Sequence, residues 1–399
     1  MKILHTADWH LGAMFGQEKR TREFELTLDW LAKTIREKKI EAVLIAGDVF
    51  DTGMPPNSAV EQYYNFLLKA RDAGVRKIVV VAGNHDSASF LDAPKELLKV
   101  LDIVVAGKPD PAYDSQIILL TEADGTPAAV LCAVPFLRDR DIRQMVSGET
   151  VDDQISRRNL GILEYYTGIC GRAKELYPDL PLIVSGHFYA VGGKAGAGTT
   201  VGNLTDVPTD HLPKEIDYLA LGHLHTPQEV GERPNQRYSG SLLKMSFGEH
   251  ETGKIALVLD TADLSAPAEE LKIPVFQRIE KISGTVEELC RQIDAFKQEG
   301  ASVWLHAENT GDFQPKLVEL LTERCRGSEI RIITWNNTKP NPAVQQRRLE
   351  TGKPLNKLTP EEVFENLLSK QPLAEDEKES WRAAFREAVT ELNETDINE

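Results

Sequence analysis

A short apolar run that ends in a glycine and an aspartate places the strongest constraint on how this chain folds. Ala42 to Ala46 has the composition of a strand that is buried on both faces, as in a parallel sheet covered by helices. Gly47 and Asp48 follow directly, at the position where open α/β sheets place their ligand sites. Because an aspartate after a strand more often caps the next helix, one such pair by itself is weak evidence.

Strands and helices alternate over the first part of the chain. Strands at 2–7, 42–46 and 78–82 are separated by two helices, whose apolar side chains recur every three or four residues at 24–35 and 60–68. This alternation predicts a parallel βαβαβ unit and the α/β class. Asp8 and His10, after the first strand, are expected to point to the same side of an extended backbone.

Later strands predict a second sheet and then a small separate module. The second sheet is expected to contain strands at 117–120, 128–134, 182–184, 218–221, 237–241 and 254–260. Its first two strands should form a hairpin around the turn at Asp124-Gly125. After a weak linker at 261–268, strands and helices alternate again, at 275–282, 286–296, 302–307, 315–325 and 329–334.

Composition narrows the class of protein. The chain has 399 residues, for which two or three domains are expected, and its 41% of hydrophobic and 27% of charged residues are ordinary for a globular protein. Its net charge is −16. No apolar stretch reaches about 18 residues and Met1 leads straight into a strand, so we expect a cytoplasmic protein without a membrane span. The four cysteines include no CxxC pair, which argues against a disulfide framework or a zinc knuckle. The acidic charge argues against a broad basic surface that coats nucleic acid, without excluding DNA binding.

Residues of the kinds that bind metal ions follow five of the expected strands. One histidine alone is more often a core or surface residue. We do not expect by chance, however, that so many histidines directly follow strands. Imidazole, carboxylate and amide oxygen together suit manganese, iron or zinc better than calcium. Two ions about 3.5–4 Å apart that share one carboxylate would account for the number of donors and would bind the oxygens of a phosphate group. The candidates are Asp8, His10, Asp48, Asn84, His85, His187, His223 and His225.

These motifs, in this order and spacing, resemble the calcineurin-like metallophosphoesterase superfamily. They are Asp8-Trp9-His10, Gly47-Asp48-Val49-Phe50-Asp51, Gly83-Asn84-His85-Asp86, Gly186-His187 and Gly222-His223-Leu224-His225. Within the superfamily, the stretches 1–12, 47–53 and 239–247 resemble the family of bacterial SbcD nuclease subunits, and the likeness covers most of the chain.

The resemblance implies a role for each of these residues. One Mn²⁺ ion would be held by Asp8, His10, Asp48 and His225, and a second by Asp48, Asn84, His187 and His223. His85 would be a catalytic residue that is not a ligand, hydrogen-bonding the scissile phosphate and protonating the leaving oxygen. Asp86 would orient the His85 ring, with a helix cap as the alternative. Asp51 stands where archaeal and eukaryotic relatives often carry a substrate-contacting histidine, a role that does not suit a carboxylate.

The resemblance also implies an architecture and partners. The fold would be a two-sheet sandwich flanked by helices, with a small αβ capping domain and C-terminal helices. The expected parts are a nuclease domain at 1–265, the capping domain at 272–337, a linker at 338–358 and a helical segment at 359–399 that docks on an SbcC-type, SMC-like ATPase. The complex would act on DNA as an ATP-dependent double-strand exonuclease and a single-strand or hairpin endonuclease, in repair, recombination and replication. A homodimer of the nuclease chain within a heterotetramer is a further expectation.

The sequence also allows other interpretations. A phosphoprotein phosphatase typically reads GDxxDRG and GNHE, whereas this chain has Thr52 in place of the arginine and Asp86 in place of the glutamate. A phosphodiesterase for small molecules would not need the small module or the tail, and a scaffold that only binds would be expected to have lost ligands. Arg138, Arg140 and Arg143 either contact phosphate or are simply solvated. The apolar stripe from Trp381 to Leu392 either docks on the ATPase or packs on the capping domain.

Overall fold

The computed structural model describes residues 1–142, 151–190, 192–193, 207–233, 235–249, 253–340, 360–369, 375 and 377–385. Arg143, nearly all of the predicted linker and the apolar stripe beyond Phe385 lie outside these residues. The chain forms two units, which are Met1–Glu308 with Lys316–Asn336 and Asn309–Pro315 with Asn337–Glu399. The domain boundaries expected from the sequence remain predictions.

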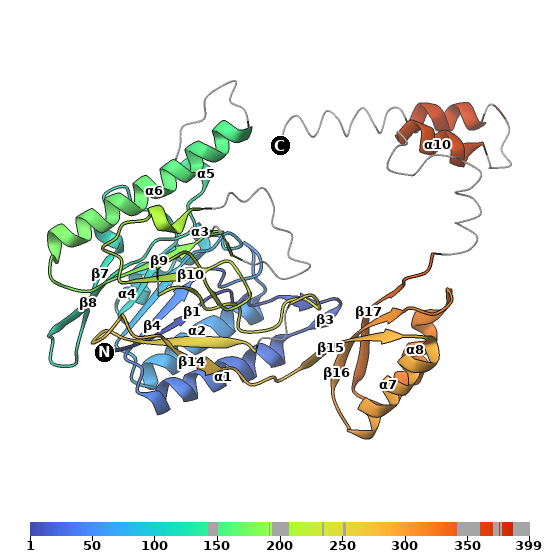
Figure 1. Ribbon diagram of the computed structural model, residues 1–399, viewed down its shortest axis with the longest axis horizontal. Coiled ribbons are helices and arrows are strands. Elements are labelled where there is room, and N and C mark those ends of the chain that lie inside the picture. The colour runs from blue at the N-terminus through green and yellow to red at the C-terminus, as the bar shows by residue number, and fades with distance from the viewer. Residues whose placement is uncertain are drawn as a thin grey trace. The chain divides into compact units, whose positions relative to one another are not determined.

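The first sheet contains the predicted βαβαβ unit (Figure 1). Its six strands, in order across the sheet, are β14 (Glu269–Lys272), β13 (Ile255–Asp260), β1 (Lys2–Thr6), β4 (Ala42–Ala46), β5 (Lys77–Val81) and β6 (Ile103–Ala106). The four strands from β1 to β6 run parallel, and β13 pairs antiparallel with β1, Leu4 lying opposite Val258. The assignment of 254–260 to the second sheet was therefore wrong, because an apolar run identifies a strand but not the strand that it pairs with.

The second sheet also has six strands. In order they are β11 (Gln228–Glu229), β12 (Gln236–Tyr238), β10 (Tyr218–Gly222), β9 (Leu182–His187), β8 (Pro127–Cys132) and β7 (Ile117–Thr121). The hairpin of β7 and β8 is confirmed, with Ile118 opposite Leu131 in an antiparallel pair. β8, β9, β10 and β12 are parallel.

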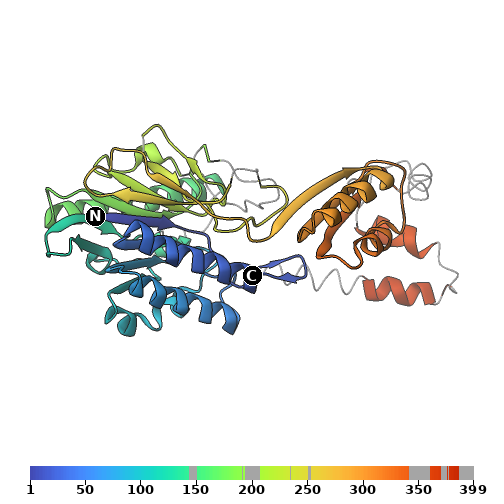
Figure 2. The same cartoon turned by 90° about the horizontal axis from the view of Figure 1, so that it is seen from below.

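Alternating side chains of the central strands face two different apolar layers. In β4, Val43 and Ile45 pack with the helices α1 (Thr21–Lys38) and α2 (Asn57–Asp72), whereas Leu44 packs between the two sheets. The long helix α6 (Val151–Leu176) covers the other face of the second sheet, where its Ile169 packs with Val184. The two sheets are thus sandwiched between helices, and Figure 2 shows α1 and α2 in blue beneath the first sheet. The predicted α/β fold with two sheets is confirmed.

Shorter elements complete this part of the chain. They are the hairpin of β2 (Met14–Phe15) and β3 (Glu18–Lys19), the helices α3 (Ala88–Asp92), α4 (Lys95–Lys99) and α5 (Asp139–Ile142), and the turns η1 (Asp114–Gln116) and η2 (Thr209–His211). None of the helices in the described ranges is long and apolar enough to cross a membrane.

The small αβ module forms as the sequence predicts. Its elements are β15 (Arg278–Gly284), α7 (Val286–Gln298), β16 (Val303–Asn309), α8 (Leu317–Cys325) and β17 (Ile330–Asn337), with the strands in the order β15-β16-β17. Leu289 and Ile293 of α7 and Leu321 of α8 are buried against the sheet. Thr285 begins α7 with a capping box to Glu288, which satisfies backbone amides at the start of the helix. In the second unit, Phe364 of α10 (Pro360–Leu368) stacks on Phe385, with ring centroids 4.1 Å apart.

Candidate metal centre

Backbone hydrogen bonds bring together the loops that follow β1 and β4. The amide of Asp8 donates to the carbonyl of Gly47 at 3.0 Å, and the amide of His10 donates to the carbonyl of Asp48, also at 3.0 Å. The second sheet joins through His223, whose amide donates to both carboxylate oxygens of Asp8, at 2.8 and 3.0 Å. Residues more than two hundred positions apart in the sequence therefore meet at one edge of the sandwich.

Four of the predicted ligands have an uncommon backbone conformation. The φ angles of Asp8, His10, Asp48 and His223 are 51°, 49°, 49° and 104°. The expectation that Asp8 and His10 lie on an extended backbone was therefore wrong. Positive φ is unfavourable for residues with a side chain and persists where the surrounding structure enforces it, as at binding and catalytic sites.

Three motif glycines lie where no side chain fits. A Cβ atom at Gly47 would lie 2.1 Å from Nδ1 of His187, and the φ of Gly47 is 93°. A Cβ at Gly83 would lie 2.1 Å from Oδ1 of Asp48, and one at Gly222 would lie 2.0 Å from a backbone carbonyl oxygen. Each glycine is thus required because another part of the site passes against its backbone.

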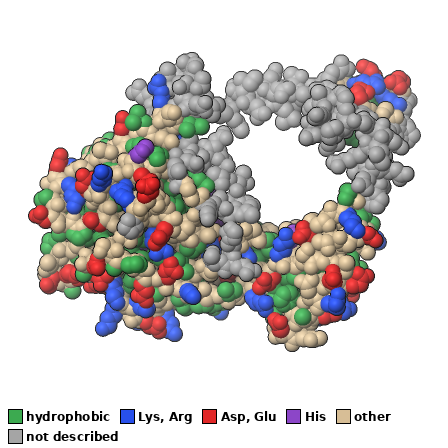
Figure 3. All heavy atoms as spheres, in the orientation of Figure 1, with side chains coloured by type: hydrophobic (Ala, Val, Ile, Leu, Met, Phe, Trp, Pro, Cys, Tyr) green, Lys and Arg blue, Asp and Glu red, His purple; other side chains and the backbone are tan. Residues whose placement is uncertain are grey.

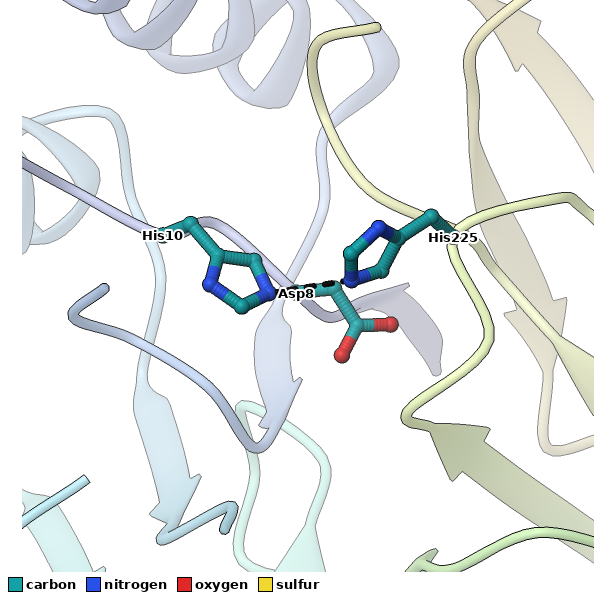
Figure 4. Close-up of side chains that lie close together, drawn as sticks. All are labelled: Asp8, His10 and His225. Carbon is teal, nitrogen blue, oxygen red and sulfur yellow. Dashed lines mark hydrogen bonds between the residues drawn. The ribbon is translucent and has the colours of Figure 1, made fainter. Parts of the chain in front are cut away.

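One group of donors consists of Asp8, His10 and His225, which come from the two sheets (Figure 4). The Nε2 atoms of His10 and His225 lie 3.1 Å apart, beside the Asp8 carboxylate. Asp8 and His10 are buried and His225 is partly exposed.

Asp48 connects this group with a second one. Its Oδ2 atom lies 3.6 Å from Nε2 of His10 and 3.3 Å from Nε2 of His187. The side-chain oxygen of Asn84 lies 3.0 Å from Nε2 of His187 and 3.0 Å from Nδ1 of His223. All seven predicted ligands therefore lie in one cluster, with Asp48 between its two halves.

The contacts of His187 suit a divalent cation when its ring is neutral. Its Nδ1 atom donates to the carbonyl of Ala46 at 3.0 Å, which leaves a lone pair on Nε2 when the ring is neutral. That lone pair faces the side-chain oxygen of Asn84, so two acceptors point at each other at hydrogen-bond distance. A cation coordinated by both atoms removes this repulsion, and these donor types suit a borderline divalent metal.

The charges of the cluster are tightly coupled. Burial alone would raise the pKa of Asp48, but the imidazoles around it hold this pKa well below its ordinary value. Burial opposes a charge on His187, yet the Asp48 carboxylate outweighs burial and raises the pKa of His187 to about 9. The buried carboxylate of Asp48 therefore requires positive charge next to it, either from protons on imidazoles or from metal ions.

His85 is exposed at the edge of the cluster. Its Nδ1 atom donates to the backbone carbonyl of Asp51 at 2.9 Å, and its ring meets that of His10 edge to face, with centroids 4.8 Å apart. Its amide donates to Oδ1 of Asp48 at 2.9 Å. The ring is thus held beside the predicted ligands through Nδ1, which leaves Nε2 for another partner.

Asp86 has neither of the roles expected from the sequence. Its carboxylate accepts hydrogen bonds from the amides of Val49, Phe50 and Gly83, at 3.1, 2.9 and 2.8 Å. It therefore ties the loop after β4 to the loop after β5 and does not orient the His85 ring. Ser87, and not Asp86, caps α3. The reason is that Asp86 is buried between these two loops, where three backbone amides need an acceptor.

Other candidates lie around the cluster. Arg138 donates to the carbonyl of Asp86 at 3.1 Å, beside His85, whereas Arg140 is 71% exposed and lies near Asp141. Sequence reasoning missed Glu249, whose carboxylate lies 3.7 Å from Nδ1 of His225. No motif includes Glu249, so only the folded structure could identify it.

Both the sandwich and the later part of this chain match families of known proteins. Residues 1–227 match the calcineurin-like phosphoesterase family, and residues 275–371 match a family described as the type 5 capsule protein repressor C-terminal domain. The SbcD subunit of the nuclease SbcCD of Escherichia coli strain K12 is 32% identical over 398 residues, 96% of this chain and 97% of that protein. The proteins of the same name from Bacillus subtilis and Rhodobacter capsulatus are 32% and 33% identical, over 68% and 67% of this chain and 68% of each relative. The chain therefore belongs to the calcineurin-like phosphoesterases and, within them, to the family of SbcD subunits of the nuclease SbcCD.

Proposed function

We propose that this chain is the nuclease component of an SbcCD-type complex and that it hydrolyses DNA phosphodiester bonds at a centre of two Mn²⁺ ions. The observation that carries the proposal is the cluster of imidazole, carboxylate and amide donors from five strand ends, in which Asp48 lies between His10 of one group and His187 of the other. One ion would be held by Asp8, His10, Asp48 and His225, and the other by Asp48, Asn84, His187 and His223. When bound, two such ions stabilise the charge that develops on phosphate oxygens and activate water for in-line attack.

His85 supplies the proton for the leaving oxygen. Because its Nδ1 proton is held by the carbonyl of Asp51, a second proton on the ring resides on Nε2. Nε2 can hydrogen-bond a phosphate oxygen and then transfer this proton to the oxygen whose bond to phosphorus breaks. The Asp51 carbonyl keeps the ring in this orientation throughout, so His85 acts without being a ligand.

The surface of the chain favours local contacts with DNA over broad electrostatic wrapping. On the face shown in Figure 3, acidic and basic side chains are interspersed over the described residues. A chain with a net charge of −16 has little electrostatic attraction to DNA, which agrees with a protein whose binding to DNA depends largely on its complex. The C-terminal helices are the proposed dock for an SMC-like ATPase, since Trp381 is 57% exposed on a helix outside the larger unit. The homodimer and the cytoplasmic location remain predictions.

A cleavage assay tests the proposal. The chain is incubated with linear, hairpin and circular DNA in the presence of Mn²⁺, with and without an SbcC-type ATPase, and in parallel with a nitrophenyl phosphomonoester. We expect DNA cleavage that a chelator abolishes and that the ATPase with ATP extends to double-strand ends. Hydrolysis of the monoester with no cleavage of any DNA would contradict the proposal and favour a phosphomonoesterase.

A further inference from the structure

The two imidazoles that face each other in the Asp8 group each have a carboxylate behind them. Their Nε2 atoms lie 3.1 Å apart. On the opposite side of each ring, Nδ1 of His10 lies 3.3 Å from Oδ1 of Asp51, and Nδ1 of His225 lies 3.7 Å from Oε1 of Glu249. At these distances the carboxylates act through their charge, which favours a proton on Nδ1 and leaves the lone pair of Nε2 directed at the centre.

Glu249 is held in place by a buried network. Its side chain is 2% exposed, its Oε1 atom accepts from the amide of Met245 at 2.9 Å, and its Oε2 atom accepts from Nζ of Lys254 at 2.6 Å. The same ammonium donates to the carbonyl of His225 and to the hydroxyl of Ser241, both at 2.8 Å. Lys254 thus neutralises Glu249 and also fixes the backbone of the histidine that Glu249 faces.

We infer that Asp51 and Glu249 are positioning residues for His10 and His225, and that Lys254 supports Glu249. The inference rests on the two-ion function proposed above. The surroundings of the other group differ, because Nδ1 of His187 donates to the carbonyl of Ala46 and lies 3.9 Å from Oδ1 of Asp8, which is itself a predicted ligand. Loss of the carboxylate of Asp51 or Glu249 should therefore weaken the ion held by Asp8, His10, Asp48 and His225 and not the other ion.

The position of Asp51 gives its side chain a role separate from that of its backbone. The backbone carbonyl accepts from Nδ1 of His85, while the carboxylate contacts His10. A substitution that changes only the side chain of Asp51 leaves the hydrogen bond of His85 in place. The effect of Asp51→Asn should therefore appear in metal binding first.

Stepwise metal titration of variants tests this inference. Mn²⁺ binding to the chelator-treated chain is measured by equilibrium dialysis, and Co²⁺ is used as a spectroscopic probe of the ligand set. Asp51→Asn and the double variant Glu249→Gln with Lys254→Met are compared with the unchanged chain. The double variant removes the pair as a whole, so that no ammonium is left buried without a partner. Glu229→Gln, at a glutamate whose side chain is 67% exposed, is the control.

We expect each variant to weaken one of the two Mn²⁺ binding steps about 10–100-fold, to leave the other step unchanged and to shift the visible spectrum of the Co²⁺ form. The control should leave both steps unchanged. Two unchanged steps in both variants, or an equal loss of both steps, would overturn the positioning roles. If the unchanged chain itself binds fewer than two ions, the proposed two-ion function fails instead, so the two failures are distinguishable.

Discussion

At the level of single residues, the site depends on side chains that have charged neighbours but little access to water. The carboxylate of Asp48 lies between His10 and His187 and also accepts a hydrogen bond from the amide of His85. All of these contacts are with other residues of the site. His85 differs from Asp48, because its side chain is exposed. Its Nδ1 atom contacts the carbonyl of Asp51, so its Nε2 atom is left for another partner. Substitutions of Asp48 and of His85 should therefore have different consequences.

Replacing His85 with alanine should slow cleavage strongly while both ions remain bound. The change removes a proton donor and none of the seven predicted ligands, so the rate of DNA cleavage should fall about 10²–10⁴-fold. Metal content and cleavage rate are measured on the same preparation, and His211→Ala, at an exposed histidine outside the cluster, is the control. Loss of metal from the His85 variant would refute its assignment as a catalytic residue that is not a ligand.

His5 should make the chain less stable in acid. Burial, with a smaller contribution from the charge of Arg237, lowers the pKa of this histidine to about 3. Between about pH 6.5 and 3 the unfolded chain binds a proton that the native chain does not, so stability falls as the pH falls, by about 1.4 kcal/mol per pH unit. Urea unfolding at several pH values, in the presence of a chelator, should show a slope that is smaller by one proton in His5→Gln. Equal slopes in the two chains would contradict this account.

At the level of elements, the site exists because strands of two sheets end at the same edge of the sandwich. The ends of β1, β4 and β5 carry Asp8, Asp48 and Asn84, and the ends of β9 and β10 carry His187 and His223. The glycines at these ends allow the loops to approach one another closely. The motif glycines are thus as necessary for the geometry as the ligands themselves.

Adding one methyl group at Gly83 should disrupt the site from within. Its Cβ would lie 2.1 Å from Oδ1 and 2.3 Å from the backbone nitrogen of Asp48, which leaves no room without a shift of the ligand. We expect Gly83→Ala to lose stability by about 1–3 kcal/mol and to lose bound metal. Gly171→Ala is the matched control, because nothing lies within 4 Å of its added Cβ and α6 should gain up to about 1 kcal/mol. Full metal content in Gly83→Ala would count against the close approach.

The sequence was sufficient to predict which residues cluster, but not how the backbone presents them. Strand ends and donor types identified Asp48 and His187, because the carboxyl ends of parallel strands meet at one edge. The positive φ of Asp8 and His10 could not be predicted, since it arises from hydrogen bonds to a loop some forty residues away. The pairing of β13 with β1 and the contact of Glu249 with His225 also join distant parts of the chain, so the periodicity of the sequence could not predict them.

At the level of the whole molecule, the chain combines a phosphoesterase sandwich with a C-terminal segment in a second unit. The family relationship extends over both, because the Escherichia coli relative matches 96% of the chain. Within this unit Phe364 stacks on Phe385 and Trp381 is exposed, and docking of the segment on a partner remains a proposal. Chemistry and assembly should therefore be separable.

Ending the chain at residue 358 should leave nuclease chemistry intact and abolish association with an SbcC-type ATPase. None of the predicted ligands lies beyond His225, so Mn²⁺-dependent cleavage of single-stranded DNA should persist at the rate of the full chain. Co-elution with the ATPase on size-exclusion chromatography measures association. Undiminished complex formation by the shortened chain would contradict docking through the C-terminal helices.

The central claim is that two ions share one aspartate, and the most direct measurement is the metal content of the chain and of its Asp48→Asn variant. Both are loaded with Mn²⁺, freed of loosely bound ions and analysed for metal per folded chain. The account predicts two ions in the unchanged chain and the loss of at least one in the variant, because Asp48 contacts both groups of donors. A folded chain that binds no Mn²⁺, or an Asp48→Asn variant that keeps both ions at unchanged affinity, would contradict it.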